Sequence, residues 1–115
     1  MDERVVKSWN VNFFQTARGD RPVEDFIKDQ DEATYAKILT AISLLRNGGP
    51  FLKPPYIKKL QNKLYELRIS GVVAIRIFYT IQNNEYYLLH AFKKKTQKIP
   101  TKELKIAIDR IREVI

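Results

Sequence analysis

The chain has 115 residues, of which 21 are Lys or Arg and 13 are Asp or Glu, so its formal net charge is +8. This length suits a single domain over residues 1–115, whose core needs no disulfide or metal. The sequence has no Cys and one His, which excludes disulfides, thiol catalysis and zinc sites built from several such ligands. No apolar stretch reaches the ~18 residues of a membrane span, and the first residues lack the apolar segment of a signal peptide, so we expect a cytoplasmic protein.

The first half of the chain predicts one strand and two helices. Apolar residues alternate with polar ones from Trp9 onward, which predicts a strand over about 6–15. Pro22 suits the first turn of a short helix over 22–29. Apolar residues at helical spacing then predict a longer helix over about 31–46.

The ends of this longer helix are marked by polar residues and glycines. Asp29 or Asp31 is expected to cap its start. Asn47-Gly48-Gly49 is expected to end it. The following Lys53-Pro54-Pro55 is predicted to be a loop, because Pro lacks an N–H donor and disfavours helix in the residue before it.

Strands dominate the rest of the chain, at about 64–70, 73–81 and 85–92, where β-branched and aromatic residues are frequent. Short turn signals between them predict antiparallel hairpins. A last helix is predicted over about 101–114, with Pro100 at its N-terminal boundary. This order predicts an α+β fold, in which two N-terminal helices pack on one face of a small, mostly antiparallel sheet and a C-terminal helix completes the domain.

The positive charge is concentrated in the second part of the chain. Residues 1–50 carry seven basic and eight acidic side chains, a net charge of −1, whereas residues 51–115 carry 14 and five, a net charge of +9. Lysines are densest in segments 53–63 and 93–105. This asymmetry indicates either a surface that faces a polyanion or, with about equal weight, a solubilising face. Nucleic acid and an acidic partner fit the first interpretation, and no amphipathic helix favours a membrane.

Charged residues occur inside two of the predicted strands. Because the aliphatic face should pack on the helices, Glu66, Arg68 and Arg76 are expected to share the other, open face of the sheet. The alternative to a functional cluster is a purely structural Glu–Arg pair between strands, which contributes little to stability. We give this structural interpretation about half of the total weight.

The single His lies in the next strand. If the turn before this strand has an odd number of residues, His90 should lie beside Arg76, and if the number is even, Ala91 should. A lone His in a strand is more often structural than catalytic.

Lysines follow directly after this last strand. Two arginines, several lysines, one glutamate and some aromatics suit an RNA phosphodiester, because cations hold the phosphate and stabilise the extra negative charge of the transition state. No cofactor or metal is expected. The residues expected to contact RNA are Lys58, Lys59, Lys63, Lys93, Lys95, His90 and Phe92.

Several segments resemble a known family. LYELRI (64–69), Arg76-Ile77-Phe78-Tyr79, LLHAFKKKTQKIP (88–100) and the upstream GDRPVEDFI (19–27) are similar to the phage-derived, HigB-like branch of the RelE/ParE toxin superfamily. The resemblance covers nearly the whole chain and implies that family's small α+β fold. It also implies a type II toxin that cleaves mRNA on the ribosome. Its partner would be a cognate antitoxin, HigA-like with a helix-turn-helix.

The resemblance implies roles for individual residues. Arg68 and Arg76 correspond to basic residues of the first two hairpin strands, and Lys94 to one that closes the last strand. Where relatives often have a catalytic Tyr or His, this sequence has Lys98 and the two residues after it. Glu66 is a candidate base, with Lys94 or Lys98 as alternatives. The implied reaction is metal-independent, since the 2′-hydroxyl attacks the adjacent phosphate.

Two other interpretations remain beside this one. The ParE-like branch of the superfamily inhibits DNA gyrase through protein contacts and is not an enzyme, and a basic module of this size can simply bind nucleic acid. The Glu, Arg and Lys set favours the enzyme, because ParE-like proteins usually lack a complete set. The antitoxin is expected to contact the N-terminal helices and the edge of the C-terminal helix, where the chain is least charged.

Overall fold

The computed structural model describes residues 9–48 and 56–114. Within them the strands form one five-stranded sheet in the order β1-β5-β4-β3-β2. β1 pairs with β5 in parallel, and every other neighbouring pair is antiparallel. The elements are β1 (Asn10–Phe13), α1 (Pro22–Lys28), α2 (Glu32–Gly48), β2 (Ile57–Gln61), β3 (Leu64–Ile69), β4 (Ile75–Gln82), β5 (Glu85–Lys93) and α3 (Thr101–Val114).

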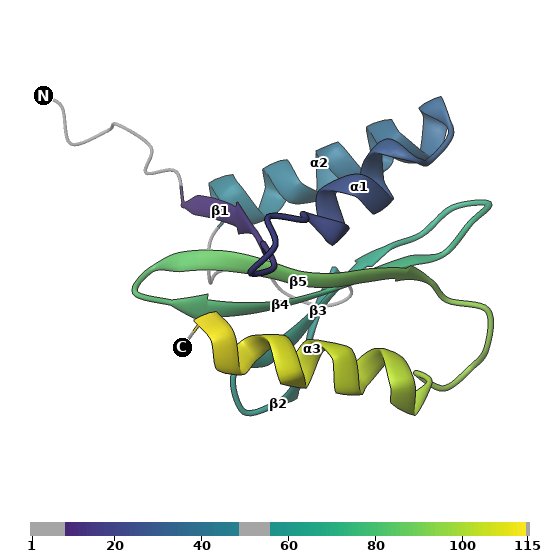
Figure 1. Ribbon diagram of the computed structural model, residues 1–115. Coiled ribbons are helices and arrows are strands. Elements are labelled where there is room, and N and C mark those ends of the chain that lie inside the picture. The colour runs from purple at the N-terminus through teal and green to yellow at the C-terminus, as the bar shows by residue number, and fades with distance from the viewer. Residues whose placement is uncertain (1–8, 49–55, 115) are drawn as a thin grey trace, which may run out of the picture.

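The helices lie on both faces of this sheet. Figure 1 shows α1 and α2 on one face and α3 on the other. Two separate groups of buried apolar residues match this arrangement. The larger group joins α1 and α2 to the sheet through residues such as Ile38, Leu45 and Ile77. The smaller one lies on the α3 side around Phe78 and Ala107. The predicted α+β fold is therefore confirmed.

β2 is absent from the sequence-based prediction. Ile57 and Leu60 are half-buried, whereas Lys58 and Lys59 between them are exposed. An edge strand of this composition lacks apolar alternation, and exposed lysines are typical of strands that must not pair with other chains. The predicted loop at 53–55 lies outside the described residues.

The ends of the N-terminal elements differ slightly from the prediction. The described part of the first strand is only Asn10–Phe13. Pro22 is at the start of α1, as predicted. Asp31 rather than Asp29 caps α2, because its Oδ1 accepts a 2.8 Å hydrogen bond from the Thr34 amide. That bond lowers the pKa of Asp31, as expected for a carboxylate at a helix N-terminus.

A two-residue turn joins β4 to β5. Gln82 faces Glu85 across the two strands. Between them Asn83 and Asn84 have φ values of 53° and 64°. Two successive positive φ angles are the mark of a type I′ hairpin turn, in which Asn is favoured. The even loop length alone would place Ala91 opposite Arg76.

A β-bulge then changes the register of this hairpin. Leu88 faces Tyr79 but His90 faces Phe78, so Leu89 is an extra residue on β5. The consequence is that Phe92 lies opposite Arg76. Both sequence-based alternatives, His90 and Ala91, are therefore wrong as the partner of Arg76, because neither includes a bulge.

Candidate functional site

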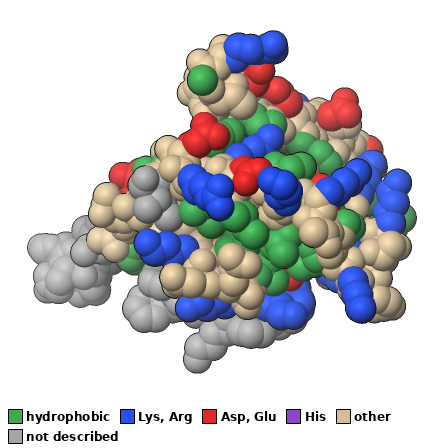
Figure 2. All heavy atoms as spheres, turned by 60° about the horizontal axis from the view of Figure 1, so that its bottom comes forward, with side chains coloured by type: hydrophobic (Ala, Val, Ile, Leu, Met, Phe, Trp, Pro, Cys, Tyr) green, Lys and Arg blue, Asp and Glu red, His purple; other side chains and the backbone are tan. Residues whose placement is uncertain are grey.

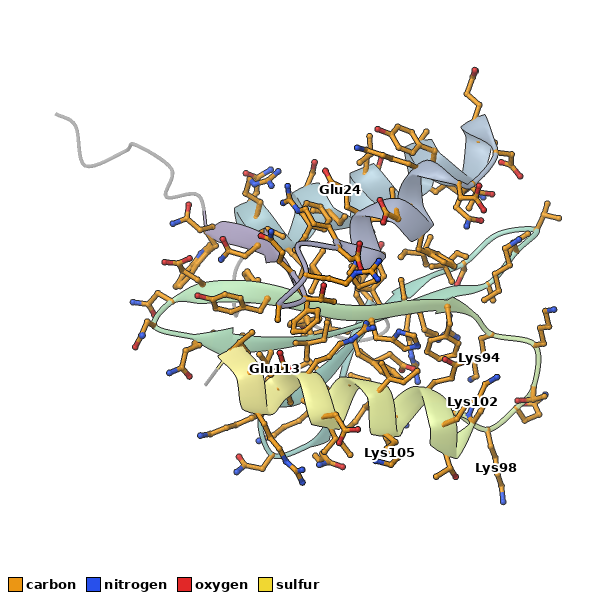
Figure 3. All side chains as sticks on the ribbon, viewed as in Figure 1. Glu24, Lys94, Lys98, Lys102, Lys105 and Glu113 are labelled. Atoms are coloured by element: carbon orange, nitrogen blue, oxygen red, sulfur yellow. The ribbon has the colours of Figure 1, made fainter. Side chains whose placement is uncertain are left out.

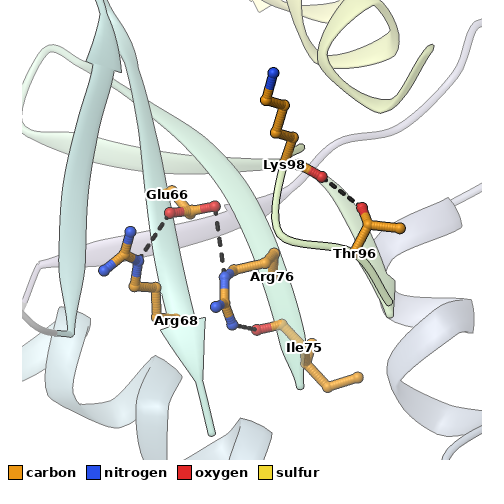
Figure 4. A network of polar contacts seen from close by, with 6 residues as sticks. All are labelled: Glu66, Arg68, Ile75, Arg76, Thr96 and Lys98. Atoms are coloured by element: carbon orange, nitrogen blue, oxygen red, sulfur yellow. Dashed lines mark hydrogen bonds and ion pairs between the residues drawn. The ribbon is translucent and has the colours of Figure 1, made fainter. Parts of the chain in front are cut away.

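Glu66, Arg68 and Arg76 form a charged cluster on the α3 side of the sheet (Figure 4). The Arg68 Nε donates a 2.9 Å hydrogen bond to Glu66 Oε1, and the Arg76 Nε lies 3.5 Å from Glu66 Oε2. Arg68 and Arg76 are directly opposite each other in β3 and β4. Like charges in that position repel, so the carboxylate between them is needed to neutralise the pair. The predicted shared face is confirmed.

This cluster is far more buried than an open sheet face would allow. The exposed fractions of the side chains are 1% for Glu66, 13% for Arg76 and 32% for Arg68. Arg76 is covered because the buried Phe92 lies opposite it and because α3 packs on this side. Its Nη1 donates to the Ile75 carbonyl oxygen at 3.0 Å. The expectation of an open face is therefore wrong for Arg76 and holds only in part for Arg68.

Of Lys58, Lys59 and Lys63, only Lys58 shares a face of the sheet with the cluster. Lys58 lies directly opposite Glu66, so the two side chains share a face. Lys59 lies opposite Tyr65 and therefore faces the α1 and α2 side. Lys63 is in the turn before β3, with φ of 66°. Because β2 was not predicted from the sequence, the positions of these three lysines relative to the two faces of the sheet could not be predicted either.

The lysines after β5 lie around the start of α3. Figure 3 shows Lys94, Lys98, Lys102 and Lys105 at this end of the molecule. The Lys94 backbone N–H continues the β4–β5 ladder by donating to the Ala74 carbonyl oxygen at 2.8 Å. The Lys98 side chain extends away from the two guanidinium groups in Figure 4. The structure therefore groups Lys98 with the α3 lysines and not with the charged cluster.

His90 is tied to α3. Its Nε2 lies 2.6 Å from Glu103 Oε1, and both side chains are about 15% exposed, with values of 15% and 16%. The His90 ring stacks on Phe92 at 5.7 Å between centroids. Burial lowers the pKa of His90, the hydrogen bond to Glu103 opposes this, and the Arg110 charge adds to the lowering. Glu103 is a partner that sequence reasoning missed, since no sequence signal joins two residues of different elements.

A hollow lies beside this His–Glu pair, between β5 and α3, with a volume of ≈ 490 Å³. It brings together four residues that were expected to contact RNA. Figure 2 shows Lys and Arg side chains spread over this side of the molecule among apolar ones. We call it the β5–α3 hollow; its polar and aromatic lining includes Phe26, His90, Phe92, Lys93, Lys95, Thr96, Lys102 and Glu103.

We expect the stability of the protein to fall as the pH drops below about 6.5, the ordinary pKa of His. In the folded state the pKa of His90 is lowered, so the unfolded state binds the proton more readily and gains population in acid. His90→Gln should reduce the loss of melting temperature between pH 7.5 and 5.5 by roughly a few degrees. Thermal unfolding at several pH values measures this. An identical pH dependence in the two proteins would contradict it.

The fold and the charged cluster place the protein in a class of small α+β proteins with a basic sheet face. Residues 25–112 match the model of the phage-derived Gp49-like proteins (DUF891), so the chain belongs to this family. The match includes every residue of the charged cluster. No curated protein matches the chain.

Within residues 9–48 and 56–114, no helix is long and apolar enough to cross a membrane. Within the same residues, no three or more His, Asp or Glu side chains are grouped so that they could hold a metal ion.

Proposed function

We propose that the protein is a HigB-like toxin of the RelE/ParE superfamily that cleaves mRNA on the ribosome. The observation that carries this proposal is the charged cluster, in which Arg68 and Arg76 pair with one carboxylate and Lys58 lies opposite it on the neighbouring strand. Three cations against one anion leave a net positive site on the sheet. Such a site suits a phosphodiester, whose charge increases in the transition state.

In the proposed reaction the 2′-hydroxyl oxygen attacks the adjacent phosphorus in line, and the bond from phosphorus to the 5′-oxygen breaks. The products are a 2′,3′-cyclic phosphate and a 5′-hydroxyl, so the proton lost by the attacking oxygen is balanced by one gained by the leaving oxygen. Arg68 and Arg76 neutralise the phosphate. Lys94 is the proposed partner of the leaving oxygen, and Lys98 with the lysines of the β5–α3 hollow holds the neighbouring RNA.

The experiment is cleavage of mRNA on translating ribosomes, with the ends of the products mapped. We expect a cyclic phosphate end, and cleavage should persist when divalent ions are chelated after crosslinking has made the ribosome complex permanent. Gyrase inhibition without RNA cleavage would support the ParE-like alternative. RNA binding with neither activity would support the basic RNA-binding module.

We also propose that a cognate antitoxin, HigA-like with a helix-turn-helix, covers the α2 side of the molecule. Among the described residues the large hydrophobic side chains that remain exposed are Tyr35, Leu39, Leu44, Tyr56 and Val72. Three of these five belong to α2, and a groove of ≈ 380 Å³ runs between α2 and the end of β3. Leu44 and Tyr56 line this groove, and exposed apolar side chains beside a groove indicate a protein interface.

Leu44→Asp should therefore weaken antitoxin binding by about 30-fold, because it places a charge in an apolar interface. Leu44 is 38% exposed, so the substitution should leave the fold intact. Binding of the purified toxin variant to the antitoxin measures this, and hydrogen exchange in the complex locates the contact. Protection confined to residues 64–98 would mean that the antitoxin plugs the charged cluster instead.

A further inference from the structure

Glu66 is the most buried ionisable side chain of the charged cluster, with 1% of it exposed. Both of its oxygens face guanidinium groups: Oε1 accepts the Arg68 Nε–H and Oε2 faces the Arg76 Nε. A general base must lie within hydrogen-bond reach of the proton that it removes. Here no oxygen of Glu66 is open to an RNA hydroxyl, so its place in the fold suits a different role.

The two arginines use their nitrogens differently. Arg76 is held at two points, by Glu66 and by the Ile75 carbonyl oxygen, and little of it is exposed. Arg68 is held only through Nε, and within residues 9–48 and 56–114 its two terminal nitrogens donate to no protein group. About a third of this side chain is exposed, so Arg68 is accessible to a ligand from solvent.

We infer that Glu66 is a positioning residue, which fixes Arg68 so that its two terminal nitrogens form a bidentate site for one phosphate group of the RNA. This inference rests on the proposed function and deepens it. A guanidinium held through Nε keeps the parallel pair of N–H donors that matches two phosphate oxygens. Arg76, paired with the other oxygen of Glu66, adds charge, and the exposed Lys58 opposite Glu66 adds a third cation.

The arrangement also explains why a carboxylate is present in a site for an anion. Without Glu66 the guanidinium groups of Arg68 and Arg76, which are directly opposite across the strands, would repel each other. The pairing of Glu66 with Arg76 is itself incomplete, since neither Glu66 Oε2 nor Arg76 Nε has a hydrogen-bond partner among the described residues. The carboxylate is therefore committed most strongly to Arg68, the more exposed of the two arginines.

A double-mutant cycle tests this inference. The probe is a fluorescent RNA oligonucleotide with 2′-O-methyl groups at every position, which cannot be cleaved, and no ribosome is present. Glu66→Gln and Arg68→Lys should each weaken binding by about tenfold, because a neutral amide holds the Arg68 Nε–H less strongly than a carboxylate does, and because Lys lacks the bidentate fork. The double variant should bind no more weakly than Arg68→Lys alone, since Glu66 acts only through Arg68.

Glu24→Gln is the matched control, because Glu24 is a partly exposed α1 residue whose partners are Arg21 and Lys28. It should bind like the wild type. If Glu66→Gln does not fold, Glu66→Asp replaces it, since a shorter carboxylate keeps the charge but withdraws from the Arg68 Nε. Additive losses in the double variant, unchanged binding in Glu66→Gln, or no binding by the wild type would each overturn the inference.

Cleavage assays separate this inference from the proposed function. On ribosomes, the Glu66→Gln variant should cleave mRNA more slowly than the wild type. Its cleavage rate should still fall at low pH as the wild-type rate does (the acid limb of the pH profile), because another group removes the proton of the 2′-hydroxyl. Loss of that limb would identify Glu66 as the base and overturn the positioning role. A wild type that cleaves no mRNA while the binding cycle still shows full coupling would refute the proposed function and leave the phosphate site standing.

Discussion

Arg76→Ala is expected to lower mRNA cleavage by at least about 100-fold and to destabilise the fold by about 3 kcal/mol. The loss of activity follows from removing one of the two positive charges opposite each other on β3 and β4. The loss of stability follows because Glu66, with 1% of its side chain exposed, is left with only one of its two guanidinium partners. Urea unfolding and ribosome-dependent cleavage measure the two effects.

Two matched variants separate charge from geometry. Arg76→Lys keeps the charge but loses the planar group, so it should recover more stability than activity. Arg112→Ala removes an α3 arginine that is 76% exposed and should change neither quantity beyond about 0.5 kcal/mol. Cleavage by Arg76→Ala at the wild-type rate would remove the assignment of Arg76 to the site.

The shared face of Glu66, Arg68 and Arg76 could be predicted because alternation in a strand is a strict geometric rule. Their burial could not be predicted, since it depends on α3 and on Phe92 reaching the position opposite Arg76. That position is set by the bulge at Leu89, which no turn signal marks. A sequence pattern therefore identified the members of the cluster and missed their environment.

The strands of the fold also include some that could be predicted from the sequence and one that could not. Strands β3, β4 and β5 are rich in β-branched and aromatic residues and were predicted within about two residues of their observed ends. β2 was missed because its consecutive exposed lysines carry no periodic signal. The missed strand matters for the site, because β2 is what places Lys58 opposite Glu66.

Replacing Lys93, Lys94 and Lys95 together with Gln is expected to give the largest loss of RNA binding. If all three contact phosphates, the slope of log affinity against log salt should become smaller by about 2, because each cation on a single strand contributes about 0.7. Lys93 and Lys95 line the β5–α3 hollow, and Lys94 lies between them at the end of the β4–β5 ladder. Titrations with the 2′-O-methyl RNA at several salt concentrations measure the slope.

The matched control changes the same amount of charge elsewhere. Arg18, Lys28 and Lys37 are exposed cations of the N-terminal part of the chain, and their replacement with Gln also removes three charges from the formal net charge of +8. If the lysines after β5 contact RNA directly, this control should keep nearly the full salt slope, because distant charges release few counterions. Equal changes of slope in the two triple variants would mean that RNA senses only the overall charge, and the lysines after β5 would lose their place in the site.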